Sequence, residues 1–327
     1  MKQSLQIWLE AARPKTLPLA LVSILTGSVL AYSAGHFSLT IAIMAFATAT
    51  LLQILSNLAN DYGDAVKGTD NENRLGPQRA MQTGAVSAKQ MKQAIIFNIV
   101  LTAISGLVLV FYALSSPESI ITFIGLGILA IIAAIAYTMG SKPYGYVGLG
   151  DISVFLFFGL LGVSGTYFLH TGHVDTTLFL PALGCGLLAV AVLNINNMRD
   201  IENDRECGKR TVAVRLGQHK AKQYHFILLG GAILAFAAYL LIQDKPLWIS
   251  LPFLLSVYVV IHHGKAVWDT EKPAQIAPML PVIVKCSLVT NVFVCNNCGS
   301  SNSGKLKKDC HCIDLMPRYT QRQPVSV

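Results

Sequence analysis

The sequence predicts an all-α, polytopic membrane protein with eight to nine transmembrane helices. Of its 327 residues, 53% are hydrophobic and only 13% are charged, whereas soluble domains carry about 25% charged residues. A membrane-spanning helix needs about 20 mostly apolar residues, and runs of that length recur along the chain. These runs are continuous and lack the alternation of a transmembrane β-barrel. Water-soluble, disordered and fibrous classes are therefore excluded.

Eight apolar segments are long enough to span a bilayer, and a ninth is weaker because it contains Lys285. The first run is itself of span length and has no small-residue cleavage pattern, so we expect no cleavable signal peptide. In chain order, the predicted spans cover residues 17–35, 38–58, 94–114, 119–138, 149–169, 178–196, 225–243, 247–263 and 276–294.

The distribution of Lys and Arg predicts the orientation of these spans. If the N-terminus is cytoplasmic, the inside segments are 1–16, 59–93, 139–148, 197–224 and 264–275, and together they hold 18 of the 25 basic residues. The four outside loops hold one. This asymmetry follows the positive-inside rule and accounts for much of the net charge of +8. The basic residues form no stripe on a polar domain, so no nucleic-acid partner is expected.

Two of the inside segments carry acidic clusters, one after the second span and one after the sixth. The clusters are Asn60, Asp61, Asp64 and Asp70, and Asn197, Asp200 and Asp204. Residues four apart on a helix share a face, so each cluster places oxygen ligands one turn apart. Carboxylates on one face repel each other unless a cation shares them. Oxygen ligands without nearby His or Cys favour Mg²⁺.

The two halves of the chain form a weak internal repeat, which predicts that both clusters face one cavity. Mg²⁺ keeps coordination sites for substrate phosphate, so the clusters could hold two ions bridged by a diphosphate. Interleaved basic residues would bind the remaining phosphate oxygens; they are Arg79, Lys142, Lys209 and Arg210. A diphosphate site that opens into an apolar helical bundle predicts a polyprenyl diphosphate. Solvated surface charge is the alternative reading of any single acid, but paired acids at the membrane edge favour a functional site.

These motifs resemble the UbiA superfamily of intramembrane prenyltransferases, whose two Asp-rich motifs are similar to residues 60–64 and 200–204. Finer features resemble its naphthoate branch, the 1,4-dihydroxy-2-naphthoate polyprenyltransferases. They are residues 12–17 (ARPKTL), 60–70 (NDYGDAVKGTD), 137–143 (YTMGSKP) and 197–211 (NMRDIENDRECGKRT). In one departure, Gly68 stands where the superfamily has a third Asp. Asp70, two positions later, matches the spacing of the naphthoate branch.

The resemblance implies a nine-helix UbiA-like bundle with a central cavity that opens sideways to the lipid. It implies Mg²⁺-dependent transfer of a polyprenyl group from polyprenyl diphosphate to 1,4-dihydroxy-2-naphthoate, with loss of CO₂ and diphosphate, in menaquinone (vitamin K2) biosynthesis. The location would be the bacterial cytoplasmic (inner) membrane. Asp61, Asp64, Asp200 and Asp204, with Asn60, Asn197 and Asp70, would hold the metal. The four basic residues would stabilise the diphosphate.

Two further residues are candidates for orienting the aromatic acceptor, Arg13 and Tyr137. Each has an alternative interpretation, Arg13 as an anchor of the first helix and Tyr137 as an interfacial aromatic. Two alternative functions also stay open: a 4-hydroxybenzoate polyprenyltransferase of ubiquinone biosynthesis, and a membrane transporter. A CDP-alcohol phosphotransferase is disfavoured because its single Asp-Gly-x-x-Ala-Arg motif is missing from the sequence.

The composition changes abruptly after about Asn291. We therefore expect a transmembrane domain over residues 1–294 and a polar, Cys-containing tail over 295–327 that is not part of the fold. Its Cys295-x-x-Cys298 and Cys310-His311-Cys312 could bind Zn²⁺. The interpretation that we favour is a shifted reading frame or a divergent end, which would leave the ninth helix incomplete.

Overall fold

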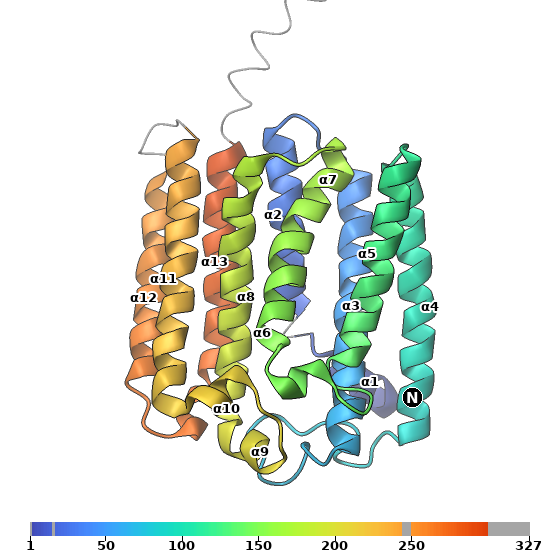
Figure 1. The fold of residues 1–327 in the computed structure, drawn as a ribbon, viewed down its shortest axis with the longest axis vertical. Coiled ribbons are helices and arrows are strands. Elements are labelled where there is room, and N and C mark those ends of the chain that lie inside the picture. Colours follow the sequence, from blue (N-terminus) through green and yellow to red (C-terminus); the bar gives the residue numbers. More distant parts are fainter. Residues whose placement is uncertain (1, 15–16, 244–249, 300–327) are drawn as a thin grey trace, which may run out of the picture.

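The computed structural model describes residues 2–14, 17–243 and 250–299, and these form helices and connecting loops without a strand. In chain order the helices are α1 (Lys2–Ala12), α2 (Leu17–Ser33), α3 (Leu39–Val66), α4 (Ala88–Ala113), α5 (Pro117–Ala136), η1 (Tyr144–Val147), α6 (Gly150–Val154), η2 (Phe155–Gly165), α7 (Thr166–Thr171), η3 (Thr176–Leu178), α8 (Phe179–Arg199), α9 (Ile201–Glu206), α10 (Val212–Leu216), α11 (Gln218–Ile242), α12 (Leu251–Trp268), η5 (Pro273–Ile276) and α13 (Met279–Gly299). Figure 1 shows the long helices side by side, with α1, α9 and α10 at one end of the bundle. We call this the acidic end.

Eight helices are long and apolar enough to cross a membrane, or up to nine if Gln6–Ala12 and α2 form one bent span. The predicted eight to nine transmembrane helices are therefore confirmed. One span, Gly150–Thr171, is composite, because α6, η2 and α7 follow one another without a break.

Several helices run further than the apolar segments that predicted them. α3 continues to Val66, eight residues past its predicted end, so the first acidic cluster begins on a helix and not in a loop. α4 begins at Ala88, six residues early, because Ser87 and Gln90 form a capping box ahead of the apolar run. Hydropathy marks the stretch that suits hydrocarbon, whereas the helix ends where the backbone is capped.

The spans pack into two groups that differ in burial. α8 is the central helix of one group and packs against α11, η2 and α13. Within its most apolar stretch 72% of residues are buried, compared with 6% for α5. α5 packs on α3 and α4 in the other group. One face of α5 is therefore left uncovered by the described part of the chain.

The composite span has a π-helical middle, η2, which packs tightly on α8. Gly159 permits this approach, because a Cβ there would lie 2.7 Å from the carbonyl oxygen of Ala182. Small residues at such contacts are typical of helix pairs in membranes. Ser23 of α2 donates a hydrogen bond to the backbone oxygen of Phe158 in the same stretch. π-Helical turns are frequent at functional sites, and η2 borders the cavity described below.

The last span is long enough to cross a membrane, since Pro273–Val294 is continuous in hydropathy and α13 extends to Gly299. Asn291 is fully buried and accepts hydrogen bonds from Cys185 at 2.7 Å and Thr26 at 3.1 Å. The chain near Asn291 is therefore packed into the bundle. The expected zinc ligands Cys310, His311 and Cys312 lie outside the described residues, as do the side chains of residues 295–298.

Candidate active site

Asn60, Asp61 and Asp64 of the first acidic cluster lie on the last two turns of α3, Asp70 lies in the loop that follows, and the three acids surround Arg79. The Arg79 guanidinium donates to Asp64 Oδ2 at 2.9 Å and lies 3.1 Å from Asp70 Oδ2 and 3.4 Å from Asp61 Oδ1. Arg13 forms an ion pair with the same oxygen of Asp61. All three acids are buried. The two arginines supply the positive charge that buried carboxylates require.

A close contact between α3 and the end of α5 fixes the position of this cluster. Gly63 lies so near Thr138 that a Cβ would be 2.6 Å from the Thr138 carbonyl oxygen. The Thr138 hydroxyl donates to the carbonyl of Ala59 at 2.9 Å and lies 3.1 Å from Asn60 Oδ1. The absence of a side chain at position 63 thus brings the loop after α5 against the acids.

The second cluster lies at the break between α8 and α9. Asp200 occupies this break, with φ −98° and ψ 17°, and the adjacent Arg199 donates to both of its carboxylate oxygens. Arg74 joins the two clusters, because its Nε lies 3.3 Å from Asp70 and 3.8 Å from Asp200. Sequence reasoning assigned no role to Arg74 or Arg199. The i,i+4 spacing of Asp70 and Arg74 was the available signal.

Lys209 makes a second connection between the clusters. Its Nζ lies 3.5 Å from Asp64 and 3.9 Å from Asp204. In the same region Asn203 Nδ2 donates to the carbonyl oxygen of Thr69 at 2.9 Å. Arg74 and Lys209 therefore bring the two acidic segments together at the acidic end, although of the predicted metal ligands only Asn60, Asp64 and Asn197 are among the residues that line the cavity described below.

The charges in these clusters shift several pKa values. Burial alone would lower the pKa of Arg79, but Asp64, Asp70 and Asp61 outweigh it and raise that pKa. Burial raises the pKa of Asp70, and it raises the pKa of Asp204 to about 6 despite the nearby Lys209. For Asp200, hydrogen bonds and charge from Arg199 overcome burial and lower the pKa. Burial thus favours the protonated form of Asp70 and Asp204, whereas Arg199 favours the ionised form of Asp200.

The donor set suits a hard divalent cation, because it consists of carboxylate and amide oxygens. Both carboxylate oxygens of Asp70 are buried without a hydrogen bond, although arginines lie at ion-pair distance. Among the described residues, however, no three His, Cys, Asp or Glu side chains already converge on one metal position. The guanidinium of Arg79 lies where the first cluster converges. The chemistry of the residues thus fits Mg²⁺, while their charge is balanced by arginine and lysine.

A cavity of about 610 Å³ extends from these clusters into the bundle. Its polar end is lined by Arg13, Asn60, Asp64, Arg79, Tyr137, Asn197 and Lys209. The rest is lined mainly by apolar residues of α2, α3, α4, α5 and η2. The cavity therefore combines a charged head region with an apolar body.

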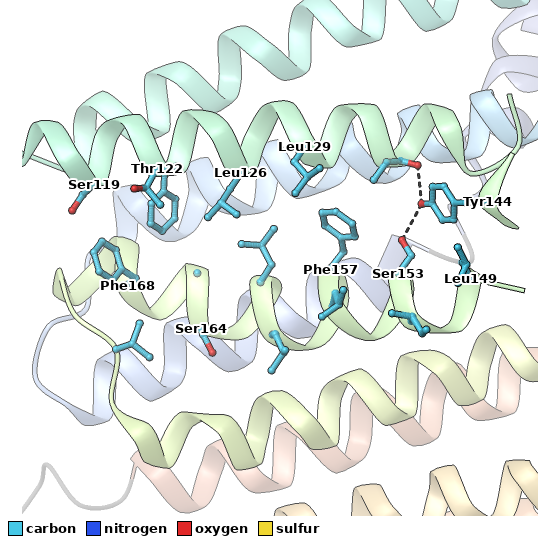
Figure 2. A pocket seen from close by; sticks show the side chains of 18 of the residues that line it. Ser119, Thr122, Leu126, Leu129, Tyr144, Leu149, Ser153, Phe157, Ser164 and Phe168 are labelled. Atoms are coloured by element: carbon cyan, nitrogen blue, oxygen red, sulfur yellow. Dashed lines mark hydrogen bonds between the residues drawn. The ribbon is translucent and has the colours of Figure 1, made fainter. Parts of the chain in front are cut away.

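A second, wider groove of about 970 Å³ adjoins the cavity between α5 and the composite span. Figure 2 shows Leu126 and Leu129 of α5 facing Phe157 across it. Leu126, Phe157 and Tyr144 line both the cavity and the groove. The Tyr144 hydroxyl lies between the two walls, donating to the Ala133 carbonyl at 2.8 Å and lying 2.9 Å from Ser153 Oγ. The groove leads from the uncovered face of α5 toward the charged end.

Some of the predicted basic and acceptor residues line the cavity, and others do not. Arg13 and Tyr137 both line the cavity, and Arg13 has a left-handed φ of 54°, unusual for a non-glycine residue. Lys142 and the side chain of Arg210 are exposed and are not among the cavity-lining residues of the described chain. Of the four predicted diphosphate ligands, two therefore lie at the cavity and two lie outside it.

These features define a class: a polytopic membrane protein in which buried acids and bases lie at one end of an apolar cavity. Residues 20–285 match the UbiA prenyltransferase family. The chain belongs to this family.

Similar proteins agree with this assignment. The chain is 48% identical to the 1,4-dihydroxy-2-naphthoate octaprenyltransferase of Haemophilus influenzae, over 90% of this chain and 96% of that protein. It is 50% identical to the protein of the same name from Escherichia coli, over 88% of this chain and 93% of that protein. Among solved structures, a UbiA homolog from Archaeoglobus fulgidus bound to DMAPP and Mg²⁺ has a TM-score of 0.64 and 15% identity, covering 90% of this chain and 99% of that one. The fold is thus shared even where the sequences have diverged.

Proposed function

We propose that this protein transfers a polyprenyl group from polyprenyl diphosphate to 1,4-dihydroxy-2-naphthoate, releasing CO₂ and diphosphate, as a step of menaquinone biosynthesis. The relatives at 48–50% identity carry the acceptor assignment. The observation that carries the reaction class is the single cavity with Asp64, Arg79 and Lys209 at its head and an apolar groove beside it.

The charged end suits the diphosphate of the substrate. We assign Mg²⁺ binding to Asp61, Asp64, Asp200 and Asp204, with Asn60, Asn197 and Asp70; the bound metal would neutralise the negative charge of the leaving diphosphate. Arg79 and Lys209 would contact the phosphate oxygens directly, because both line the cavity. Lys142 and Arg210 are exposed and would contribute at most to the electrostatic attraction of the anion.

The reaction needs no protein nucleophile. The bond between the allylic carbon and the diphosphate oxygen breaks, and its electron pair leaves with the diphosphate. The ring carbon bearing the carboxylate attacks the allylic cation, and the carboxylate leaves as CO₂, returning its electron pair to the ring. Arg79 and Lys209 would stabilise the developing diphosphate charge. The apolar walls would keep water away from the cation.

Tyr137 and Arg13 are the candidates for orienting the acceptor, because both lie on the cavity wall next to the acids. Burial and the charge of Asp151 raise the pKa of Tyr137, so its phenol stays protonated and can donate a hydrogen bond. The hydrocarbon tail would leave the cavity through the groove between α5 and η2. Its apolar lining suits isoprene units, and the uncovered face of α5 gives access from the lipid.

The substrate assignment is tested with the full-length protein in membranes. Labelled polyprenyl diphosphate is supplied with 1,4-dihydroxy-2-naphthoate or 4-hydroxybenzoate, in Mg²⁺ or in EDTA. We expect a prenylated product and CO₂ release with the naphthoate, in Mg²⁺ only. Product only from 4-hydroxybenzoate would overturn the acceptor, and no product from either would favour transport.

The role of the first cluster is tested by Asp64→Asn. This change keeps the side-chain size but removes the charge that faces Arg79 and Lys209, so we expect turnover to fall by about 100-fold or more, the scale of losing one electrostatic partner of the transition state. Asp175→Asn is the matched control, because Asp175 is exposed and caps the N-terminus of η3, far along the chain from both acidic clusters. A variant at position 64 with wild-type turnover would contradict the assignment.

We further propose that the acidic end faces the cytoplasm of a bacterial inner membrane. The support is the concentration of Lys and Arg in the segments at that end. A membrane-impermeant thiol reagent applied to spheroplasts should label Val174→Cys, in the exposed loop at the opposite end, and not Lys142→Cys. The reverse pattern would invert the topology.

A further inference from the structure

Tyr146 is a buried residue of η1 to which neither metal binding nor phosphate binding has been assigned above. It lies in the segment between α5 and α6, with 8% of its surface exposed. Three parts of this tyrosine contact three different segments of the site. Each contact can be assigned a direction from the chemistry of its partner.

The Tyr146 hydroxyl connects Asp64 to the second acidic segment. It donates to Asp64 Oδ1 at 2.8 Å, since a carboxylate can only accept. Its single proton is then used, so Thr69 Oγ1, 2.6 Å away, must be the donor in their contact. The Thr69 carbonyl in turn accepts from Asn203 at 2.9 Å. The hydroxyl therefore fixes one oxygen of Asp64 within a chain of hydrogen bonds that crosses the site.

The Tyr146 ring contacts two ammonium groups. Lys209 Nζ lies 5.3 Å and Lys67 Nζ lies 5.5 Å from the ring centroid, both within the range of cation–π attraction. Lys209 is also the residue that lies between Asp64 and Asp204. A lysine side chain has four rotatable carbons and little directional preference of its own. The ring limits where this ammonium can lie.

The backbone of η1 is attached to the segment that carries Lys209. The amide of Arg210 donates to the Tyr146 carbonyl at 2.9 Å, and the Arg215 guanidinium donates to the Val147 carbonyl at 2.7 Å. These two hydrogen bonds hold the backbone of η1 against the segment that carries Lys209 and so keep the Tyr146 ring close to the Lys209 side chain. This makes the ring–ammonium contact a built feature of the loop and not a chance approach of two side chains.

We propose that Tyr146 is a positioning residue for diphosphate binding: its hydroxyl orients Asp64, and its ring holds the Lys209 ammonium between Asp64 and Asp204. The inference rests on the proposed function, because it assumes that this ammonium contacts the diphosphate. It extends that function by naming a third segment of the acidic end, the one after α5, as part of the phosphate site. The exposed Lys142 in the same segment does not have this role.

Two substitutions separate the contributions of the hydroxyl and the ring. Tyr146→Phe removes the hydrogen bonds and keeps the ring under Lys209, whereas Tyr146→Leu removes both. The control is Tyr224→Phe, because the Tyr224 hydroxyl also donates to an aspartate, Asp151 at 3.0 Å, but lies outside the site. Affinity for inorganic diphosphate is measured by calorimetry on the full-length protein in detergent with Mg²⁺, beside KM and kcat for polyprenyl diphosphate.

We expect Tyr146→Phe to weaken diphosphate binding by about 3-fold to 10-fold, the scale of the net contribution of one typical hydrogen bond. Tyr146→Leu should weaken it further, by about another 2-fold to 30-fold. KM should rise more than kcat falls, and Tyr224→Phe should bind as the wild type does. Wild-type affinity in both Tyr146 variants, or equal loss in all three, would overturn the proposal.

A double variant guards against a purely structural effect. If the ring acts through Lys209, then Tyr146→Leu combined with Lys209→Ala should bind diphosphate no more weakly than Lys209→Ala with Tyr146→Phe. A further loss from removing the ring would contradict the proposal. The experiments distinguish failure of the proposed function from failure of the role of Tyr146. A wild-type protein that binds diphosphate but prenylates no acceptor would refute only the proposed function. An active wild-type protein whose Tyr146 variants bind diphosphate normally would refute only the role of Tyr146.

Discussion

Replacing Arg79 with alanine tests whether the site is a balanced cluster of charges that metal can compensate. The guanidinium is buried and lies within 3.4 Å of three buried carboxylates, with the shortest contact, 2.9 Å, to Asp64. Arg79→Ala leaves those carboxylates without their shared cation. Removing one partner of a buried ion pair costs about 3–5 kcal/mol. We therefore expect the free energy of unfolding of this variant, measured in EDTA, to be lower than that of the wild type by about 3–5 kcal/mol.

Mg²⁺ should restore part of this loss. A ligand present at 100 times its dissociation constant stabilises the folded state by about 2.7 kcal/mol, so Mg²⁺ at that concentration should recover about half to nine-tenths of the deficit. The wild type should gain less, because its guanidinium already occupies the point where the carboxylates converge. The variant should thus show the larger Mg²⁺-dependent stabilisation.

The assay is thermal unfolding of the detergent-solubilised protein, with and without Mg²⁺. Lys265→Ala is the control, because Lys265 is exposed on α12 away from the acids, and it should behave as the wild type does. Equal Mg²⁺-dependent shifts for Arg79→Ala and the wild type would refute the reasoning, as would a variant that is fully stable in EDTA.

Two further predictions concern glycines. Gly127→Trp should raise KM for a long polyprenyl diphosphate more than for dimethylallyl diphosphate, because Gly127 lines the cavity and has open space for a side chain. Gly230 also has open space but does not line the cavity, so Gly230→Trp should leave both KM values unchanged. Equal effects of the two substitutions would refute the cavity assignment. Gly63→Ala should destabilise the protein by about 1–3 kcal/mol, because its methyl group would clash with Thr138. Gly125→Ala should be neutral or stabilising, because no neighbouring atom lies within 4 Å of the added Cβ. Thermal unfolding measures both effects, and a stabilised Gly63 variant would contradict the close contact.

The number and order of the spans could be predicted from sequence because hydropathy is a local property. Each helix satisfies its own backbone hydrogen bonds, so 20 apolar residues identify a span without knowledge of its neighbours. Boundaries could not be predicted as well. α3 continues through Asp61 and Asp64 because arginines from distant segments neutralise those acids, and a local reading of polarity ends the helix at residue 58.

The two acidic segments could be recognised in the sequence because their i,i+4 spacing recurs four spans later, but several of the partners of these acids could not be predicted. Arg74 bridges Asp70 and Asp200 across the two segments, and its role depends on how the loops fold over each other. Lys142 has the residue type and the sequence neighbourhood of a phosphate ligand, yet it is exposed. A motif fixes which residues are near in the chain and leaves the direction of each side chain to the tertiary structure.

A helical membrane protein with two separated acidic segments can be inferred from the amino-acid sequence, because hydropathy, charge asymmetry and i,i+4 spacing are local patterns along one chain. Which cations pair with those acids, and where the apolar space lies, depends on how the helices pack. The groove exists because α5 leaves one face uncovered beside the π-helical span. Tyr146 joins the site because its loop folds between Asp64 and Lys209, residues 145 positions apart in the chain. Such contacts depend on packing between distant segments, which no local pattern encodes.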